Sequence, residues 1–94
     1  MLLHKLSDQE LVSSFLQGNS KALEELFSRH KNRVFSFIIS KVRNRDLADD
    51  IFQDAFFKAI TSLKQGKYNE EGKFLPWLMR ISHNLVIDHF RKLK

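Results

Sequence analysis

The sequence contains very few residues that interrupt a helix. Its 94 residues include only three glycines and one proline, and the short turn signals of β-hairpins are missing. Nine phenylalanines and an apolar content of 43% can supply one hydrophobic core, which suits a single small domain. We therefore expect an all-α fold, a compact bundle of about four helices that forms one domain over residues 1–94.

Capping residues and apolar spacing predict where the helices lie. Ser7 and Glu10 form a capping box that starts the first helix, and Gly18 ends this helix. We expect Asp46 to cap the third helix and Gly66 to end it. The four helices are expected approximately at residues 7–17, 20–43, 46–65 and 74–93.

Composition excludes several classes of function. The chain has no cysteine, which rules out disulfides and cysteine–zinc sites. No apolar run approaches the ~20 residues of a membrane span, and the N-terminus lacks the apolar core of a signal peptide, so we expect a cytoplasmic protein. Phosphate-binding glycine loops and nucleophile motifs are missing, and the four histidines are scattered. We expect neither an enzyme nor a bound cofactor.

The distribution of charge indicates two different partners. The net charge is +5, which favours an acidic partner, with nucleic acid as the first candidate. Cations dominate residues 73–94, whereas residues 46–54 carry four aspartates and no cation. Such asymmetry suggests one basic and one acidic surface.

One stripe of the last helix combines cations with an amide. At 100° per residue this stripe contains Arg80, Asn84, Ile87, Arg91 and Lys94. His83 lies beside the stripe. Leu78, Ile81 and Leu85 fall on another arc and are expected in the core, with Trp77 at the border between the two arcs. Cations bind phosphates and amides read base edges, so the stripe is a candidate nucleic-acid surface.

The third helix carries an aromatic residue in the middle of its polar arc. This residue is Phe57, and the arc around it contains Asp46, Asp50, Gln53, Asp54 and Thr61. An exposed aromatic flanked by acids is a candidate anchor for a basic protein partner. Alternatively, a neighbouring helix covers Phe57, or its exposure has no function. The aspartates could hold a divalent cation, but stabilisation of the helix dipole explains them more simply, so no metal is expected.

The polar segment before the last helix contains Lys67, Tyr68 and Asn69. Tyrosine can stack on a base and asparagine can read one. From the residues alone, however, a solvated connector is the better interpretation. The chain stops inside a basic run, Arg91-Lys92-Leu93-Lys94, without a helix-stop signal. We therefore expect a piece of a longer protein, the alternative being a natural short protein with a frayed end.

Two blocks of the sequence resemble region 2 of bacterial sigma factors of the extracytoplasmic-function (ECF) group. They are DLADDIFQDAFFKAI (46–60) and FLPWLMRISHNLVIDHFRK (74–92), in the family's order and separation. The pattern WL-x-x-I-x-x-N-x-x-x-D-x-x-R is matched by Trp77, Leu78, Ile81, Asn84, Asp88 and Arg91. The resemblance extends over most of the chain, from about residue 7 to residue 94.

This resemblance implies a domain that binds the RNA polymerase core and recognises the −10 promoter element. In the family the acidic helix docks on a basic coiled coil of the beta-prime subunit, a role that maps onto Asp50, Gln53, Asp54 and Phe57. The last helix and the loop at residues 66–73 contact the non-template strand and capture an extruded base. That role maps onto Lys67, Tyr68, Asn69, Arg80, His83, Asn84, Ile87 and Arg91.

The chain also departs from the wider family. Primary sigma factors have a neighbouring pair of tryptophans for strand separation, whereas Trp77 stands alone here, which implies weaker melting and stricter promoter choice. The second, helix-turn-helix domain that reads the −35 element is absent from this chain. We expect a monomer without membrane contact, although a basic amphipathic last helix on an anionic membrane is a minor alternative. The main alternative is a regulatory module sequestered by an anti-sigma factor, with no DNA-reading activity of its own.

Overall fold

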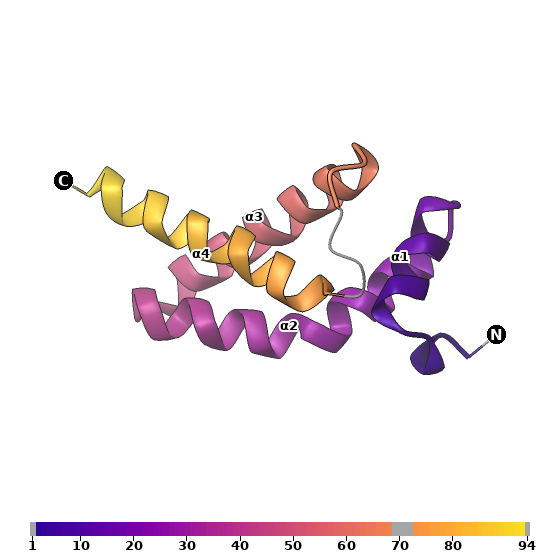
Figure 1. Cartoon of the computed structure of the whole chain (residues 1–94). Coiled ribbons are helices and arrows are strands. Elements are labelled where there is room, and N and C mark those ends of the chain that lie inside the picture. Colours follow the sequence, from indigo (N-terminus) through magenta and orange to yellow (C-terminus); the bar gives the residue numbers. More distant parts are fainter. Residues whose placement is uncertain (1, 69–72, 94) are drawn as a thin grey trace.

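The computed structural model describes residues 2–68 and 73–93. Over those residues all regular secondary structure is helical. Its elements are the short 3-10 helix η1 (Leu3–Lys5), α1 (Asp8–Leu16), α2 (Ser20–Val42), α3 (Arg45–Lys64) and α4 (Phe74–Lys92) (Figure 1). The expected all-α bundle of four helices is confirmed. Among the residues described, no helix has the length and apolar character needed to cross a membrane.

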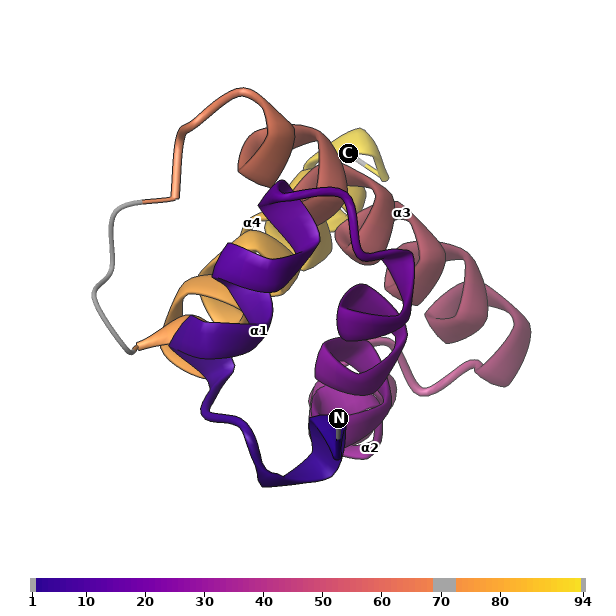
Figure 2. The ribbon, with the colours of Figure 1, turned by 90° about the vertical axis from the view of Figure 1, so that its right-hand side faces the viewer.

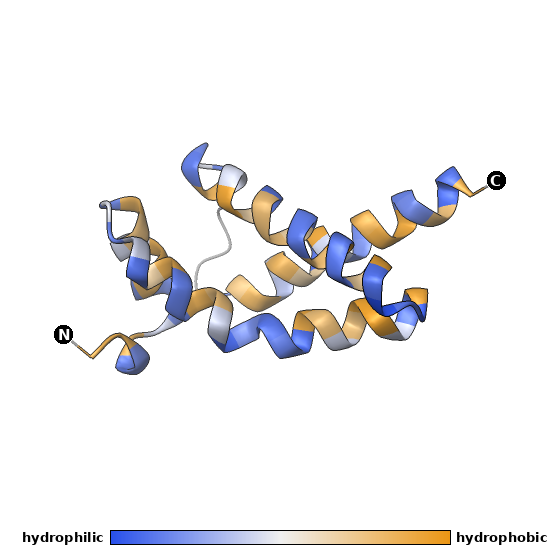
Figure 3. Ribbon diagram, turned by 180° about the vertical axis from the view of Figure 1, so that it is seen from behind, coloured by the Kyte–Doolittle hydropathy of each residue, from blue (hydrophilic) through white to orange (hydrophobic). Residues whose placement is uncertain are grey.

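The long helix α2 is the centre of the bundle. Helix α1 packs on α2, and α3 and α4 pack both on α2 and on each other (Figure 2). Each helix alternates between hydrophilic and hydrophobic residues along its length, as amphipathic helices around one core require (Figure 3). Every α-helix contributes to this core, and the larger buried side chains are Leu11, Val12, Leu26, Val34, Ile38, Ile51, Leu63, Phe74, Trp77, Leu78 and Val86.

The first helix begins as the sequence predicted. The Ser7 N–H donates to Glu10 Oε1 at 2.8 Å, and the Glu10 N–H donates to Ser7 Oγ at 3.1 Å, which completes the capping box. The bond from the Ser7 amide, with a smaller contribution from the Ser7 side chain, holds the pKa of the Glu10 carboxyl below its usual value. The helix ends at Leu16, and Gly18 follows with a φ of 108°, a conformation that favours glycine.

The prediction that Asp46 caps the third helix is wrong. Helix α2 ends at Val42, because Arg43 adopts a left-handed conformation (φ 54°), and Asn44 then becomes the cap of α3. The Asn44 side-chain oxygen accepts the Leu47 N–H at 3.0 Å. Asp46 lies inside the first turn of α3, where its charge still suits the positive end of the helix dipole.

A row of aromatic rings joins α2 to α3. Phe27 stacks on Phe56 with 4.2 Å between ring centroids, and Phe56 contacts Phe52 at 4.3 Å. Phe52 meets Phe35 edge-on at 5.9 Å, and the Arg45 guanidinium lies 5.7 Å from the Phe35 centroid. Aromatic pairs in these geometries add roughly 0.5–1.5 kcal/mol each beyond the area that they bury. This row therefore fixes the rotation of α3 relative to α2.

Polar contacts hold the N-terminal segment on α2. Asp8 accepts a bond from Arg29 Nη1 at 3.0 Å, and its other oxygen lies 2.8 Å from His30 Nε2. The same Arg29 nitrogen donates to the Leu6 carbonyl at 2.9 Å. The His30 ring also lies 5.7 Å from the ring of Phe74, so α2 contacts α1 and α4 at the same level.

The buried arc of α4 is wider than the sequence predicted. Leu78 is fully buried as expected, whereas Ile81 and Leu85 are only partly buried. Trp77, expected at the border, is 7% exposed and belongs to the core. The arc widens because α4 packs against two helices, α2 and α3, and must bury residues toward both. Ser82 is buried as well, and its hydroxyl donates to the Leu78 carbonyl at 3.0 Å.

The reassigned cap of α3 can be tested by mutation. We expect Asn44→Ala to lower the free energy of unfolding by about 1 kcal/mol, because the Leu47 amide loses its acceptor. Urea denaturation measures this change. The control is Asp46→Asn, which removes only a charge near the helix dipole, and its smaller effect should fade as salt is added. A larger loss for Asp46→Asn than for Asn44→Ala would contradict the assignment.

Candidate functional site

Two surfaces of opposite charge lie on the neighbouring helices α3 and α4. The acidic face of α3 consists of Asp50, Gln53, Asp54 and Phe57, and all four side chains are exposed. The basic stripe of α4 consists of Arg80, Asn84, Ile87 and Arg91, of which only Ile87 is partly buried. The two helices pack on each other, so the two surfaces lie next to each other in one bundle (Figure 1).

Phe57 is the most exposed large apolar side chain among the described residues. It is 73% exposed, while Ala55 and Ala59 on the other side of α3 are fully buried. No helix among the described residues covers Phe57. Within this part of the chain, the alternative that a neighbouring helix buries Phe57 is therefore wrong. Burial of such a ring typically stabilises a folded protein by roughly 1.5–3 kcal/mol, and the isolated domain lacks this contribution from Phe57. An exposed aromatic among acids can anchor a partner that carries an apolar pocket and cations.

The basic stripe presents cations and an amide to solvent. Arg91 lies 3.9 Å from Asp88, and both side chains are more than half exposed, so this ion pair contributes little. Asn84 is exposed, and its amide has both donors and an acceptor for a base edge. His83 is exposed next to the stripe, and its ring lies 6.0 Å from that of Phe37 in α2. Lys94, expected in the stripe, lies outside the described residues.

The loop residues expected to contact DNA differ in their exposure. Lys67 is exposed, and its N–H donates to the Ser62 carbonyl at 2.9 Å. Tyr68 is only partly exposed, because its ring packs edge-on against Trp77 at 4.9 Å and against Phe74 at 5.9 Å. In this conformation the Tyr68 ring forms part of a core wall and not an open stacking platform. Asn69 lies outside the described residues.

A narrow groove between α3 and α4 continues the acidic face. Its volume is about 180 Å³, and its lining residues are Leu47, Asp50, Ile51, Asp54, Leu85, Asp88, His89 and Lys92. The contribution of Asp88, His89 and Lys92 was missed from the sequence, because helical spacing does not say which arc of α4 meets α3. Asp88 adds a third carboxylate near those of α3.

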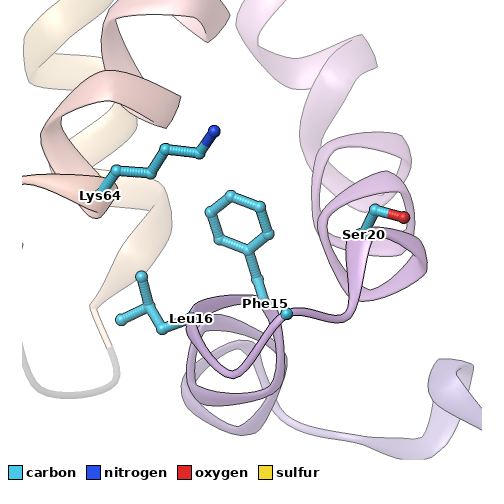
Figure 4. Close-up of a pocket in the computed structure, with 5 residues that line it drawn as sticks. Phe15, Leu16, Ser20 and Lys64 are labelled. Atoms are coloured by element: carbon cyan, nitrogen blue, oxygen red, sulfur yellow. The ribbon is translucent and has the colours of Figure 1, made fainter.

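A larger hollow lies where α1, α2 and α3 meet at one end of the bundle. It has a volume of about 400 Å³ and is lined by Phe15, Leu16, Gly18, Ser20 and Lys64 (Figure 4). It contains one hydroxyl and one amine, too few polar groups for catalysis or cofactor binding. Within the described part of the chain, no group of three or more histidines, cysteines or carboxylates converges in a way that could hold a metal ion.

Comparison with known proteins indicates the family to which the chain belongs. The family Sigma-70 region 2 matches residues 26–94. RNA polymerase sigma factor CarQ of Myxococcus xanthus is 42% identical over 80 residues, which are 85% of this chain and 45% of CarQ. The ECF RNA polymerase sigma-E factor of Haemophilus influenzae is 35% identical over 83 residues (88% of this chain, 42% of the relative). ECF RNA polymerase sigma factor SigW of Bacillus subtilis is 32% identical over 83 residues (88% and 43%).

The chain spans less than half the length of each of these relatives. No solved structure matches it significantly. The family match, however, extends over both α3 and α4 and therefore includes the acidic face and the basic stripe. The chain therefore belongs to the Sigma-70 region 2 family, and its likeness to relatives named as ECF sigma factors confirms the group that its sequence motifs predicted.

Proposed function

We propose that this chain is the part of an ECF sigma factor that docks on the RNA polymerase core and reads the −10 promoter element during transcription initiation. The observation that carries the proposal is Phe57, which is 73% exposed within an acidic face, on a helix adjacent to an exposed basic stripe. One surface suits a basic protein and the other suits DNA, so a single small domain can bind both at once.

Docking takes place through the acidic face. Asp50 and Asp54 lie one helical turn apart and attract the basic coiled coil of the beta-prime subunit. Phe57 inserts among apolar side chains of the partner, where loss of water contact supplies most of the affinity. The groove beside α4 places Asp88 near the same face and enlarges the acidic surface.

Reading takes place on melted DNA. Unstacking one base costs a few kcal/mol, and a protein that binds only the open strand offsets this cost with contacts to bases and phosphates. Asn84 reads an extruded base through its amide, whereas Arg80 and Arg91 bind phosphates. His83, Ile87 and Lys67 border the strand, and Asn69 completes the loop side. Because binding and melting use the same contacts, the domain selects its sequence while it opens the duplex.

Tyr68 has a different part in this proposal from the one that the family resemblance implies. Its ring lies against Trp77 and Phe74, so it supports the wall next to the stripe. Trp77 is 7% exposed, which leaves little of its ring to act as a wedge between base pairs. Melting then depends on capture of extruded bases and not on an inserted tryptophan.

The alternatives have less support. A module that only binds an anti-sigma factor does not need the exposed cations and amide of the stripe. A membrane-bound α4 would need its apolar side chains available to lipid, yet Leu78 is fully buried and Val86 is 3% exposed in the core. The exposed stripe therefore favours DNA reading over both alternatives.

Removal of the Phe57 ring should weaken docking. We expect Phe57→Ala to raise the Kd for RNA polymerase core about tenfold or more, the loss typical of a buried aromatic anchor. Titration of labelled domain with polymerase core measures the Kd. Leu16→Ala is the matched control, because Leu16 is also an exposed apolar residue (53%) but lies on α1, outside the acidic face. Equal affinities for Phe57→Ala and the unmodified chain would refute the docking assignment.

Asn84 and Arg91 should affect DNA binding in different ways. Asn84→Ala is expected to reduce the preference for a −10-type single strand over scrambled strands, by roughly 1–3 kcal/mol at one base position. Arg91→Ala should weaken binding to all strands alike and flatten the salt dependence. Fluorescence anisotropy with a panel of labelled strands at two salt concentrations distinguishes the two. An equal loss on every strand for Asn84→Ala would remove Asn84 as a reader of sequence.

A further inference from the structure

A chain of side-chain contacts leads from the basic stripe of α4 across to α2. The His83 ring lies 6.0 Å from the ring of Phe37, which is only partly exposed. The amine of Lys41, one turn further along α2, lies 5.7 Å from the Phe37 ring centroid. Three side chains on two helices thus form one continuous strip that ends in a cation. The ring of Phe37 lies beside both His83 and Lys41.

The strip continues along α2 by helical spacing. Arg33, Phe37 and Lys41 are four residues apart and therefore follow one face of α2. Arg33 and Lys41 are both exposed. This face of α2 therefore carries a cation on each side of a half-buried aromatic ring, next to the helix proposed to read DNA.

The opposite flank of α4 has the reverse charge. There the groove between α3 and α4 is lined by three carboxylates, with Lys92 and His89 as the other ionisable groups, so acidic side chains are in the majority. A polyanionic strand bound on the stripe is repelled by these carboxylates and attracted by the cations of α2. The charges on the two flanks therefore favour a strand that leaves the stripe toward α2 over one that leaves it toward α3.

We infer that the DNA-binding surface crosses from α4 onto α2, where Lys41 and Arg33 bind the sugar-phosphate backbone of the same strand that the stripe reads. This inference rests on the proposed function and adds two phosphate contacts to it, together with the path of the strand. Neither Lys41 nor Arg33 needs to recognise a base. Their effect is expected on affinity and on its salt dependence, for every sequence alike.

The salt dependence of binding measures this contact directly. Each phosphate contact on a single strand contributes about −0.7 to the slope of log K against log salt. We expect Lys41→Gln to flatten the slope by about 0.7. Over the decade of salt concentration from about 1 M to 0.1 M this change corresponds to an affinity about fivefold lower at 0.1 M. A short labelled single strand, titrated by anisotropy between about 0.05 and 0.3 M salt, serves as the probe.

Three further variants make the result decisive. Lys21→Gln removes the same charge from the same helix, about 30 Å along the axis from Lys41, and should leave the slope unchanged. Lys41→Arg keeps the cation and should restore the slope. Arg91→Gln, on the stripe itself, reports whether the proposed DNA surface is used at all. Melting temperatures show how far Lys41, in the last turn of α2, also stabilises that helix through its dipole.

The outcomes separate this inference from the function on which it rests. An unchanged slope for Lys41→Gln with a flattened slope for Arg91→Gln would overturn the path over α2 and leave the proposed function standing. Equal flattening for Lys41→Gln and Lys21→Gln would show a response to net charge alone and would also overturn it. A chain that fails to bind at low salt, or an Arg91→Gln slope equal to that of the unmodified chain, would count against the proposed function and this inference together.

Discussion

The aromatic packing along α2 is the constraint on which both proposed surfaces depend. Phe56 stacks on Phe27 at 4.2 Å and contacts Phe52 at 4.3 Å, and this row sets the rotation of α3. Successive residues of a helix point about 100° apart, so the burial of Phe56 turns Phe57 toward solvent. The exposed anchor is thus a consequence of its neighbour's packing. On another side of α2, the contact between His30 and Phe74 holds the start of α4 in the same way.

Helix α4 separates the two charges of the molecule. Its flank toward α3 includes Asp88 and joins the acidic face, while its flank toward α2 includes His83 and leads to Lys41. A helix with its side chains is about 10 Å across, close to the Debye length at physiological salt. The acidic face and the cations of α2, on opposite flanks of α4, are therefore largely screened from each other, whereas the stripe between them lies close to both. In the proposed function, this separation lets a small domain bind a basic protein and an acidic polymer at once.

Local signals predicted the helices well, and they failed where backbone conformation or long-range packing decided. The capping box at Ser7 was correct, because both partners lie within one turn. The cap of α3 was placed two residues late, because α2 ends in a left-handed residue, Arg43, which the sequence does not reveal. Tyr68 was expected in an open loop. Its ring instead packs edge-on against Trp77, a contact between a loop residue and a helix that helical periodicity does not reveal.

The sequence by itself determined the helical class, the family and the membership of each helix face, because helical periodicity is a local property of the chain. Helical spacing alone places Phe57 among acids and Asn84 among cations. Only the tertiary structure decided which faces stay uncovered, how deeply Trp77 is buried, and that Phe37 lies beside His83. These features depend on the rotation and contact of helices far apart in the chain. That rotation follows from the fit of many side chains at once, which no single stretch of sequence contains.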